Sequence, residues 1–272
     1  MAKGKEMHEI DQYYVIGNPV KHSLSPKIHM KFAQQTSQQI NYEALEVPID
    51  QFIQTMDKLK QDEVSGLSVT VPFKEKMCDY VDSLDEYAKI AGAVSNVVID
   101  TNNKWQGINL DGIGLVNDIQ NNHHISFQNK DILILGSGGA TRGILAPILE
   151  HKPSSVCIAN RTISKAQIVV QDFKPFGALK SMNINHILGQ YDIVINATSM
   201  SINRQLPNIS LENFKPNAFG YDLMYASSGT VFTQWCQTNK INSSDGKGML
   251  LELSKEAFLK WREVIVCTDN IL

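Results

Sequence analysis

The chain has 272 residues, which is enough for two domains of ordinary size or one large one. Hydrophobic residues make up 43% of it, and the formal net charge of −3 lacks the basic surplus expected of a nucleic-acid-binding protein. No stretch approaches the run of about 18 apolar residues that a membrane span needs. The polar start, MAKGKEMHEIDQ, has no apolar centre of the kind that signal peptides carry, so we expect a cytoplasmic protein.

The cysteines give no sign of a metal site or of disulfides. Cys78, Cys157, Cys236 and Cys267 lie far apart, with no C-x-x-C spacing. We therefore expect reduced structural thiols and no bound metal.

The first half alternates β-rich runs with amphipathic stretches. Ser25 and Pro26 suit the N-cap and the first position of a helix. A second helix is expected over 51–59, and a long one over 77–93. We expect strands over 13–17, 40–47 and 64–71, and a hairpin formed by 93–100 and 104–110.

After a connecting helix within 112–122, the second half becomes a regular βαβ series. Strands are expected over 131–136, 155–160, 191–198 and 217–224, and helices over 140–150, from Ser164 onward and over 248–261. Short apolar strands without alternation are typical of a parallel sheet covered on both faces.

The fold class is therefore α/β with two domains. Residues 1–111 form an α/β substrate domain, with a C-terminal helical segment, 246–272, packing back on it. Residues 112–245 form a Rossmann-type nucleotide-binding domain with a parallel sheet.

A glycine-rich turn follows the strand DILILG and leads into a helix. It contains Gly136, Gly138 and Gly139, together with Ser137 and Ala140. A tight turn there directs backbone N–H groups and the helix N-terminus toward a pyrophosphate. Thr141 stands where G-x-G-x-x-G has its third glycine, so the strand–turn–helix context carries the prediction of a dinucleotide site.

The end of the next strand indicates which dinucleotide binds. NAD sites usually have an acidic residue there, whereas this chain has Asn160, Arg161 and Thr162, followed by Lys165. Two cations suit a 2′-phosphate, and cations at a helix start are otherwise unfavourable. The sequence therefore favours NADP over NAD.

Ordered motifs over nearly the whole chain resemble those of the shikimate dehydrogenase family. In the first half GNPVKHSLSP is similar to G-x-P-x-x-H-S-x-S-P, and GLSVTVPFK is similar to G-x-N-V-T-x-P-x-K. GAVSN and NLDG match G-A-V-N-T and N-T-D-G in part. In the second half GSGGATRG, NRT, INATS, YDLMY and DGKGML follow in the family's order.

The resemblance implies an NADP-dependent oxidoreductase that interconverts shikimate and 3-dehydroshikimate in the chorismate pathway to aromatic amino acids. It implies that Ser23 and Ser25 hold the substrate carboxylate, that Thr70 bonds a ring hydroxyl or the carboxylate, and that Lys74 and Asp111 flank the reacting carbon. The other positions matched to the family's sites are Ser95, Asn96, Tyr225 and Leu253 for substrate, and Thr198, Ser199, Gly246 and Met249 for cofactor.

The chemistry of the lysine and aspartate pair is reasonable in itself. Hydride transfer to a ketone leaves an oxyanion, which a neighbouring ammonium stabilises and protonates. A carboxylate beside the lysine keeps it charged and oriented.

Several residues depart from the family pattern near the expected substrate. Ser68 replaces an asparagine, Ser95 and Asn96 stand where the family has Asn-Thr, and Leu110 and Leu253 replace a threonine and a glutamine. Ser201 replaces a glycine near the nicotinamide, where it would disturb ring placement. Each lost amide removes a hydrogen bond of about 1–3 kcal/mol to a buried hydroxyl.

Three functions therefore stay open: a shikimate dehydrogenase with a re-formed pocket, a paralogue acting on quinate or another cyclic hydroxy acid, or a catalytically silent NADP(H)- or metabolite-binding protein. Retention of Lys74 and Asp111 speaks against the third. A monomer and a homodimer are both compatible with the sequence, which also leaves the direction of flux open.

Overall fold

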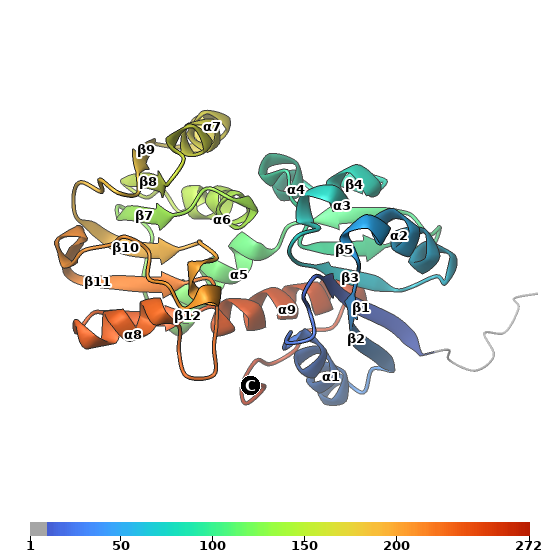
Figure 1. Cartoon of the computed structure of the whole chain (residues 1–272). Coiled ribbons are helices and arrows are strands. Elements are labelled where there is room, and N and C mark those ends of the chain that lie inside the picture. Colours follow the sequence, from blue (N-terminus) through green and yellow to red (C-terminus); the bar gives the residue numbers. More distant parts are fainter. Residues whose placement is uncertain (1–9) are drawn as a thin grey trace, which may run out of the picture. The chain divides into compact units, whose positions relative to one another are not determined.

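The computed structural model describes residues 10–272, so residues 1–9, which make up most of the polar start, lie outside the described part. The chain divides into two compact units (Figure 1). The first comprises Met1–Leu110 and Ser254–Leu272, and the second comprises Asp111–Leu253. The class predicted from the sequence, α/β with a parallel sheet in the second half, is confirmed.

The first unit is built on a mixed six-stranded sheet. Its spatial order is β2-β1-β3-β5-β6-β4, with β1 parallel to β2 and β3, and β5 antiparallel to both of its neighbours. The predicted hairpin is thus confirmed as β5 and β6. The strands are β1 (Asp11–Gly17), β2 (Ile40–Glu46), β3 (Gly66–Val69), β4 (Ser83–Leu84), β5 (Asn96–Ile99) and β6 (Trp105–Ile108).

The two faces of this sheet differ in chemistry, because alternate side chains of a strand point to opposite faces. Leu67, Val69 and Val97 belong to an apolar cluster with Phe52 and Met56 of the neighbouring helix. Tyr42, Ser68 and Asn96 lie on the other face, where they bond to one another. The helices of this unit are α1 (Ser25–Thr36), η1 (Ile49–Gln51), α2 (Phe52–Gln61), α3 (Lys74–Tyr80) and α4 (Glu86–Ala91).

The predicted continuous helix over 77–93 is wrong. The structure has α3, the short strand β4 and α4 in its place. Asp82 interrupts the helix because its carboxylate accepts the backbone N–H of Trp105 at 2.8 Å and faces Lys60 at 3.1 Å. Asp85 then caps α4 by accepting the backbone N–H of Ala88 at 2.7 Å.

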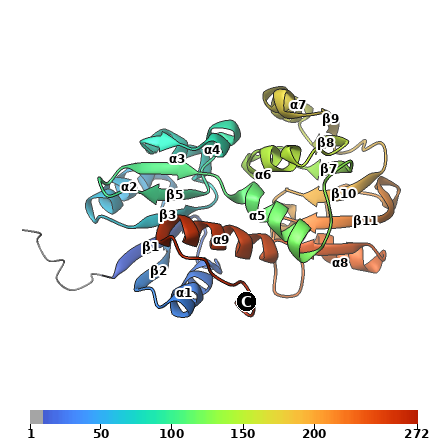
Figure 2. The same cartoon turned by 180° about the vertical axis from the view of Figure 1, so that it is seen from behind.

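The end of the chain completes the first unit. The last turns of α9 (Lys247–Arg262) lie against β1 and β3 (Figure 2). Trp261 donates its indole N–H to the Val97 carbonyl at 2.9 Å, and a Cβ at Gly66 would come within 2.6 Å of that indole. Arg262 pairs with Asp11 at the start of β1. Glycine at position 66 therefore makes room for the tryptophan that anchors the tail.

The second unit is built on a six-stranded, fully parallel sheet. Its order is β12-β11-β10-β7-β8-β9, the doubly wound arrangement in which the first strand of the series is central. The sequence did not predict the edge strands β9 and β12. The strands are β7 (Asp131–Leu135), β8 (Ser155–Asn160), β9 (Leu179–Asn183), β10 (Tyr191–Asn196), β11 (Phe214–Asp222) and β12 (Asn242–Asp245).

Helices connect these strands, and a salt-bridge cluster ties three of them together. Lys215 on β11 bridges Asp131 and Asp192 at 2.6 and 2.8 Å, and its ammonium lowers the pKa of the Asp131 carboxyl. The helices and helical turns of the unit are α5 (Asp111–Asn117), η2 (Asp118–Asn122), α6 (Gly139–Glu150), α7 (Ile163–Phe173), η3 (Lys174–Phe176), η4 (Met200–Asn203), η5 (Leu211–Asn213), α8 (Val231–Thr238) and the first turns of α9.

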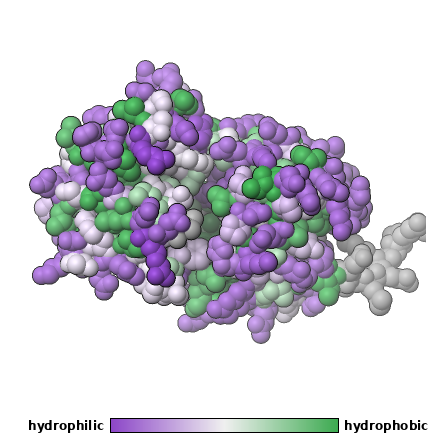
Figure 3. Space-filling view, in the orientation of Figure 1, coloured by the Kyte–Doolittle hydropathy of each residue, from purple (hydrophilic) through white to green (hydrophobic). Residues whose placement is uncertain are grey.

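Exposed hydrophobic side chains are scattered along the chain. Val71, Leu188 and Ile265 each expose 60% or more of their surface and lie far apart in sequence. The face seen in Figure 3 is mainly hydrophilic, with hydrophobic residues dispersed over it. Within residues 10–272, no helix has the length and apolar character that crossing a membrane requires.

Candidate active site

The two serines of the first motif lie at the start of α1. Leu24 occupies the N-cap, so the prediction that Ser25 caps this helix is wrong by one position. Because Ser25 does not serve as a cap, its hydroxyl is available for other partners. It accepts a hydrogen bond from the Ser23 hydroxyl at 3.2 Å.

Buried polar side chains of β2, β3 and β5 bond to one another across the sheet. Tyr42 donates its hydroxyl proton to Ser68 Oγ at 2.8 Å, and Asn96 Nδ2 donates to the same oxygen at 3.0 Å. Ser95 donates to Asn96 Oδ1 at 2.9 Å and accepts the backbone N–H of Leu110 at 2.8 Å. Four of the residues that depart from the family pattern, Ser68, Ser95, Asn96 and Leu110, therefore belong to one network.

A cluster of aromatic rings packs around Tyr42. The His29 ring is stacked on the Tyr42 ring with centroids 4.3 Å apart and an interplanar angle of 4°. Phe258 and Trp261 of α9 contact the same histidine. His29 is fully buried, and burial lowers its pKa from 6.5 to about 3, so the ring is neutral at physiological pH.

Thr70 and Lys74 follow β3, in the segment that leads into α3. A Cβ at Gly17 would come within 2.5 Å of the Thr70 methyl carbon, so the glycine of the first motif makes room for the threonine of the second. Lys74 is the first residue of α3, and its carbonyl accepts the Val94 N–H at 2.9 Å. That bond joins the lysine motif to the G-A-V segment.

Asp111 is the first residue of α5, and it is buried. Lys74 belongs to the first unit and Asp111 to the second. The pairing of the two side chains stays a prediction.

In the second unit the glycine turn has the backbone that a dinucleotide site needs. Gly136 has φ +106°, a conformation that glycine adopts readily, and its N–H donates to Ala159 at 2.8 Å. Gly138 is the N-cap of α6, and a Cβ there would meet nothing within 4 Å. Open space therefore faces the N-terminus of a 12-residue helix, which suits a diphosphate.

Thr141, at the position of the third glycine, has a structural role. It is fully buried and donates its hydroxyl proton to the Gly136 carbonyl at 3.0 Å. This hydrogen bond joins the two ends of the turn and stabilises it, so the turn forms without a third glycine.

The predicted 2′-phosphate residues lie in the loop between β8 and α7. Asn160 Nδ2 donates to the Thr162 carbonyl at 2.9 Å, which holds the loop. Arg161, Thr162 and Lys165 are exposed, and Thr162 is the N-cap of α7 without a side-chain bond of its own. Two exposed cations at a helix N-terminus form a suitable place for a phosphate.

Ser201 is bonded into a network at the carboxyl ends of β10 and β11. Its hydroxyl donates to the buried Asp222 carboxylate at 2.7 Å and accepts from Asn196 Nδ2 at 3.2 Å. Asn196 Oδ1 in turn accepts both the N–H and the hydroxyl of Thr198. Burial raises the pKa of Asp222. Ser201 thus holds the segment that carries Thr198 and Ser199 against β11.

The start of α9 packs closely against α5 and η2. Gly248 touches Asp118, because a Cβ at that glycine would come within 2.1 Å of the carboxylate. Tyr221 donates to Asp118 at 2.6 Å and accepts the Met249 N–H at 3.3 Å. The backbone of this segment is therefore fixed, with Gly246 donating its N–H to the Met224 carbonyl at 3.0 Å.

Leu253, at the position of the family's glutamine, lies on α9 against α5. A Cβ at Gly114 would come within 2.8 Å of the Leu253 Cβ. Tyr225 is half-buried after β11, in a segment tied to Asp245 by the Ala226 N–H. The roles of Leu253 and Tyr225 in substrate binding stay predictions.

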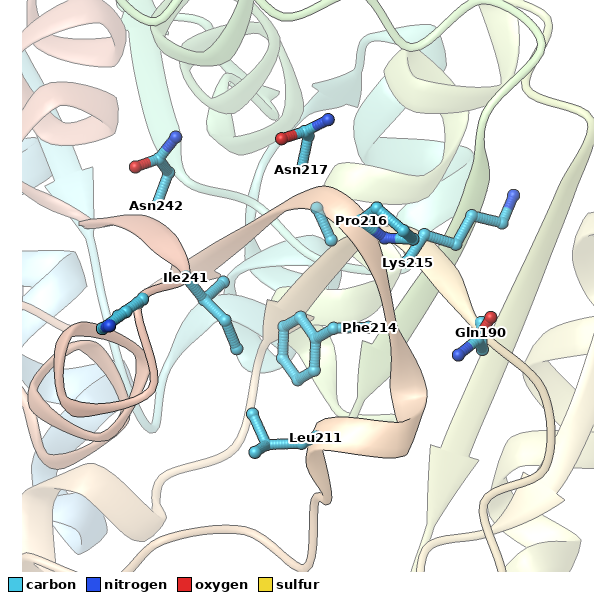
Figure 4. Close-up of a pocket in the computed structure, with 10 residues that line it drawn as sticks. Gln190, Leu211, Phe214, Lys215, Pro216, Asn217, Ile241 and Asn242 are labelled. Carbon is cyan, nitrogen blue, oxygen red and sulfur yellow. The ribbon is translucent and has the colours of Figure 1, made fainter.

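A pocket of about 410 Å³ lies in the second unit (Figure 4). Its lining comes mainly from the first residues of β11 and from the segment that leads into β12, whereas the glycine turn follows the carboxyl end of β7. Because the strands are parallel, the pocket and the glycine turn lie at opposite ends of the strands. The Phe214 and Ile241 side chains face each other, while Lys215 extends away. Its charge is paired with Asp131 and Asp192, so the pocket does not resemble an anion site.

Sequence reasoning missed Tyr42, the central member of the polar network. Ile40 and Tyr42 are two residues apart on β2 and both buried, so strand alternation places Tyr42 on an inward face. Strand alternation predicts that Tyr42 is buried, but it does not predict which residue the tyrosine bonds to. Within residues 10–272, no group of three or more His, Cys, Asp or Glu side chains has the arrangement of a metal site.

The second unit's sheet and glycine turn define a dinucleotide-binding α/β protein. Comparisons with known proteins then give the family. Residues 15–98 match the family model described as the shikimate dehydrogenase substrate binding domain, and residues 118–217 match that described as shikimate / quinate 5-dehydrogenase.

Relatives and solved structures agree with these matches. The chain is 42% identical to the shikimate dehydrogenase (NADP(+)) of Cellvibrio japonicus over 256 residues, which cover 93% of this chain and 92% of the relative. The crystal structure of an Ael1 enzyme from Pseudomonas putida is 35% identical with a TM-score of 0.87, covering 95% of each chain. That of a shikimate dehydrogenase in complex with NADP+ is 26% identical with a TM-score of 0.85, covering 96% of this chain and 93% of the other. The chain belongs to the shikimate dehydrogenase family.

Proposed function

We propose that this protein is an oxidoreductase that interconverts shikimate and 3-dehydroshikimate with NADP, in the chorismate pathway to aromatic amino acids. The observation that carries the proposal is the 42% identity to an NADP-dependent shikimate dehydrogenase over 93% of the chain. The first unit is then the substrate-binding domain, and the second is the NADP-binding domain. We also propose that the protein is located in the cytoplasm and acts as a monomer or homodimer.

The residues around the glycine turn fit the cofactor. Backbone N–H groups from Ser137 to Ala140 face the diphosphate, and Arg161 and Lys165 hold the 2′-phosphate. Thr198, Ser199, Gly246 and Met249 position the nicotinamide, which exchanges a hydride with the substrate carbon.

The first unit supplies the groups for the substrate. Ser23 and Ser25 donate to the carboxylate, and Thr70 bonds a neighbouring oxygen. Lys74 carries the proton that the substrate oxygen gains or loses, and Asp111 keeps the ammonium charged and oriented.

Turnover assays test the proposal. The protein is incubated with NADP and, in turn, shikimate, quinate and cyclohexanecarboxylic acids with one hydroxyl, while nicotinamide absorbance is followed. We expect turnover of shikimate, with a kcat in the common enzyme range of about 1–1,000 s⁻¹. Tight NADP binding without turnover of any acid would show that the chemistry has been lost.

A second candidate substrate is quinate or another cyclic hydroxy acid. Ser68 and Leu253 support it, because each lacks the amide with which the family bonds a ring hydroxyl. Turnover of quinate at a kcat/KM above that of shikimate would establish this alternative and keep the reaction class.

The cofactor assignment predicts the effect of Arg161→Ala. We expect the Kd for NADP to rise about 10- to 100-fold, because one charge-assisted contact to phosphate is lost, while the Kd for NAD stays within twofold. Fluorescence titration of the reduced cofactors measures both constants. Lys174→Ala, a cation at the other end of α7, serves as the control. Equal weakening of NADP and NAD would contradict the 2′-phosphate role.

A further inference from the structure

The loop that carries Tyr225 is tied to the junction of β12 and α9 by a half-buried ion pair. Asp245 ends β12 and Lys247 begins α9, and the carboxylate oxygen lies 3.4 Å from the ammonium. Lys247 Nζ also donates to the Ala226 carbonyl at 2.7 Å, and Asp245 accepts the Ala226 N–H at 3.4 Å. The ion pair therefore holds both polar groups of the residue directly after Tyr225, and we call it the Ala226 clamp.

The backbone before Tyr225 is fixed as well. The buried Asp222 carboxylate accepts the Met224 N–H at 3.0 Å, and the Met224 carbonyl accepts the Gly246 N–H at 3.0 Å. A Cβ at Gly246 would come within 2.3 Å of the Leu223 carbonyl oxygen, so the two segments touch backbone to backbone. Tyr225 therefore has an anchored residue on each side.

The clamp acts on the end of the loop that is nearest to Tyr225. The far end is held from α8, where Gln234 donates to the carbonyls of Ser228 and Gly229 at 3.1 and 3.3 Å. Residues 226–229 read ASSG, with no side chain larger than that of serine, so packing contributes little to fixing the near end. The near end therefore depends on the clamp for its position.

The contacts of Lys247 distinguish between two uses of its charge. A cation in the first turn of a helix is unfavourable by itself, and a bound phosphate is one way to offset that cost. Here the ammonium already bonds to a carbonyl and faces a carboxylate, whereas Arg161 and Lys165 at the start of α7 are exposed. Lys247 therefore acts on the loop and not on a phosphate of the cofactor.

We propose that Lys247 is a positioning residue for the substrate, because through the clamp it fixes Tyr225 against the segment that carries Gly246. The groups matched to the substrate and to the nicotinamide are thereby held at one spacing. This inference rests on the proposed function, and with it on the family match of Tyr225 to substrate and of Gly246 to cofactor. Gly246 keeps its bond to Met224 when the ammonium is removed. Removal should therefore weaken substrate binding and leave cofactor binding unchanged.

Lys247→Met tests the proposal by kinetics and by amide exchange. We expect the KM for shikimate to rise about tenfold, with kcat lowered less than threefold and the Kd for NADP within twofold, because a charge-assisted bond of the loop is lost. Exchange followed by mass spectrometry should be at least about fivefold faster in a peptide covering 223–229. Lys247→Arg, which keeps a charged donor, should restore both quantities to within about twofold of the natural chain. Lys240→Met, at an exposed lysine just before β12, is the matched control and should change neither.

A double-mutant cycle connects the effect to the ion pair. Asp245→Asn removes the charge that faces the ammonium, and it should raise the KM for shikimate as well. In the double variant with Lys247→Met, we expect a KM at least about threefold below the product of the two single effects, because both side chains hold the same residue, Ala226. Effects that multiply would show that the two residues act separately, and the clamp would be refuted.

The outcomes separate the clamp from the function. Unchanged exchange over 223–229 in Lys247→Met refutes the clamp, whatever the kinetics. Faster exchange with an unchanged KM, or with a loss of kcat alone, refutes the positioning role and leaves the proposed function intact. If the natural chain does not turn over shikimate, the proposed function fails. The positioning role is then measured with the acid that is turned over, and absence of turnover with every acid refutes it. Thermal unfolding of each variant shows that the protein is folded at the assay temperature.

Discussion

Lys74→Met is expected to lower kcat about 1,000-fold while the Kd for NADP stays within twofold. Methionine keeps the length and the apolar stem of the side chain and removes only the ammonium. General acid–base assistance contributes about 100- to 10,000-fold to rates of this kind, which sets the size of the effect. Stopped-flow measurement of hydride transfer, together with a cofactor titration, separates the two constants.

The control for this prediction lies on the same helix. Lys76 is exposed, and its ammonium lies 3.4 Å from the Ile49 carbonyl. Lys76→Met should leave kcat within twofold. Equal loss of rate and cofactor affinity in Lys74→Met would show that the residue shapes the fold rather than the reaction.

Acid should destabilise the protein through His29. Its pKa is about 3 in the folded chain, because burial disfavours the charged ring, against 6.5 in an ordinary setting. Between these two values the unfolded chain binds the proton and the folded chain does not, so stability falls as the pH is lowered from 6.5 toward 3. The contribution of this group over the whole window is about 4–5 kcal/mol, and it is complete at pH values above 6.5.

His29→Phe isolates that contribution. Phenylalanine keeps a ring against Tyr42 and Trp261, and it has no nitrogen to protonate and none left buried without a partner. Urea unfolding at pH 6.5 and pH 5 should show that the natural chain loses about 2 kcal/mol more than the variant. His186→Gln, at an exposed histidine, should retain the full pH dependence. An unchanged slope in His29→Phe would refute the assignment.

The sequence predicted the elements that have a strong apolar pattern and missed those that lack one. β12 reads NSSD and contains no hydrophobic residue, and β9 reads LKSMN with a single branched aliphatic side chain. Both are edge strands, where pairing with a neighbour determines the structure and local preference contributes little. The break between α3 and α4 was missed for a related reason, since Asp82 acts through Lys60 and Trp105, 22 and 23 residues away.

For the candidate site, motif order identified residue types and left their partners undetermined. When the chain is compared with the family position by position, Ser68, Ser95 and Asn96 are each counted as the loss of a hydrogen-bonding group. The antiparallel register sets Ser68 opposite Asn96, and the two bond across the strands. Cross-strand partners depend on register, which a single sequence does not give.

The discontinuity of the first unit bears on how the protein is made. Its strand β1 receives Arg262, and its sheet receives Trp261, both from the last residues of the chain. A ribosome synthesises Asp111–Leu253 as one uninterrupted stretch, and Ser254–Leu272, the remaining piece of the first unit, follows it. The second unit is therefore able to fold during translation. The first unit cannot complete its fold until Ser254–Leu272 has been synthesised, and until then its aromatic side chains stay exposed. Nascent chains stalled before Ser254 should accordingly be the species that chaperones hold longest.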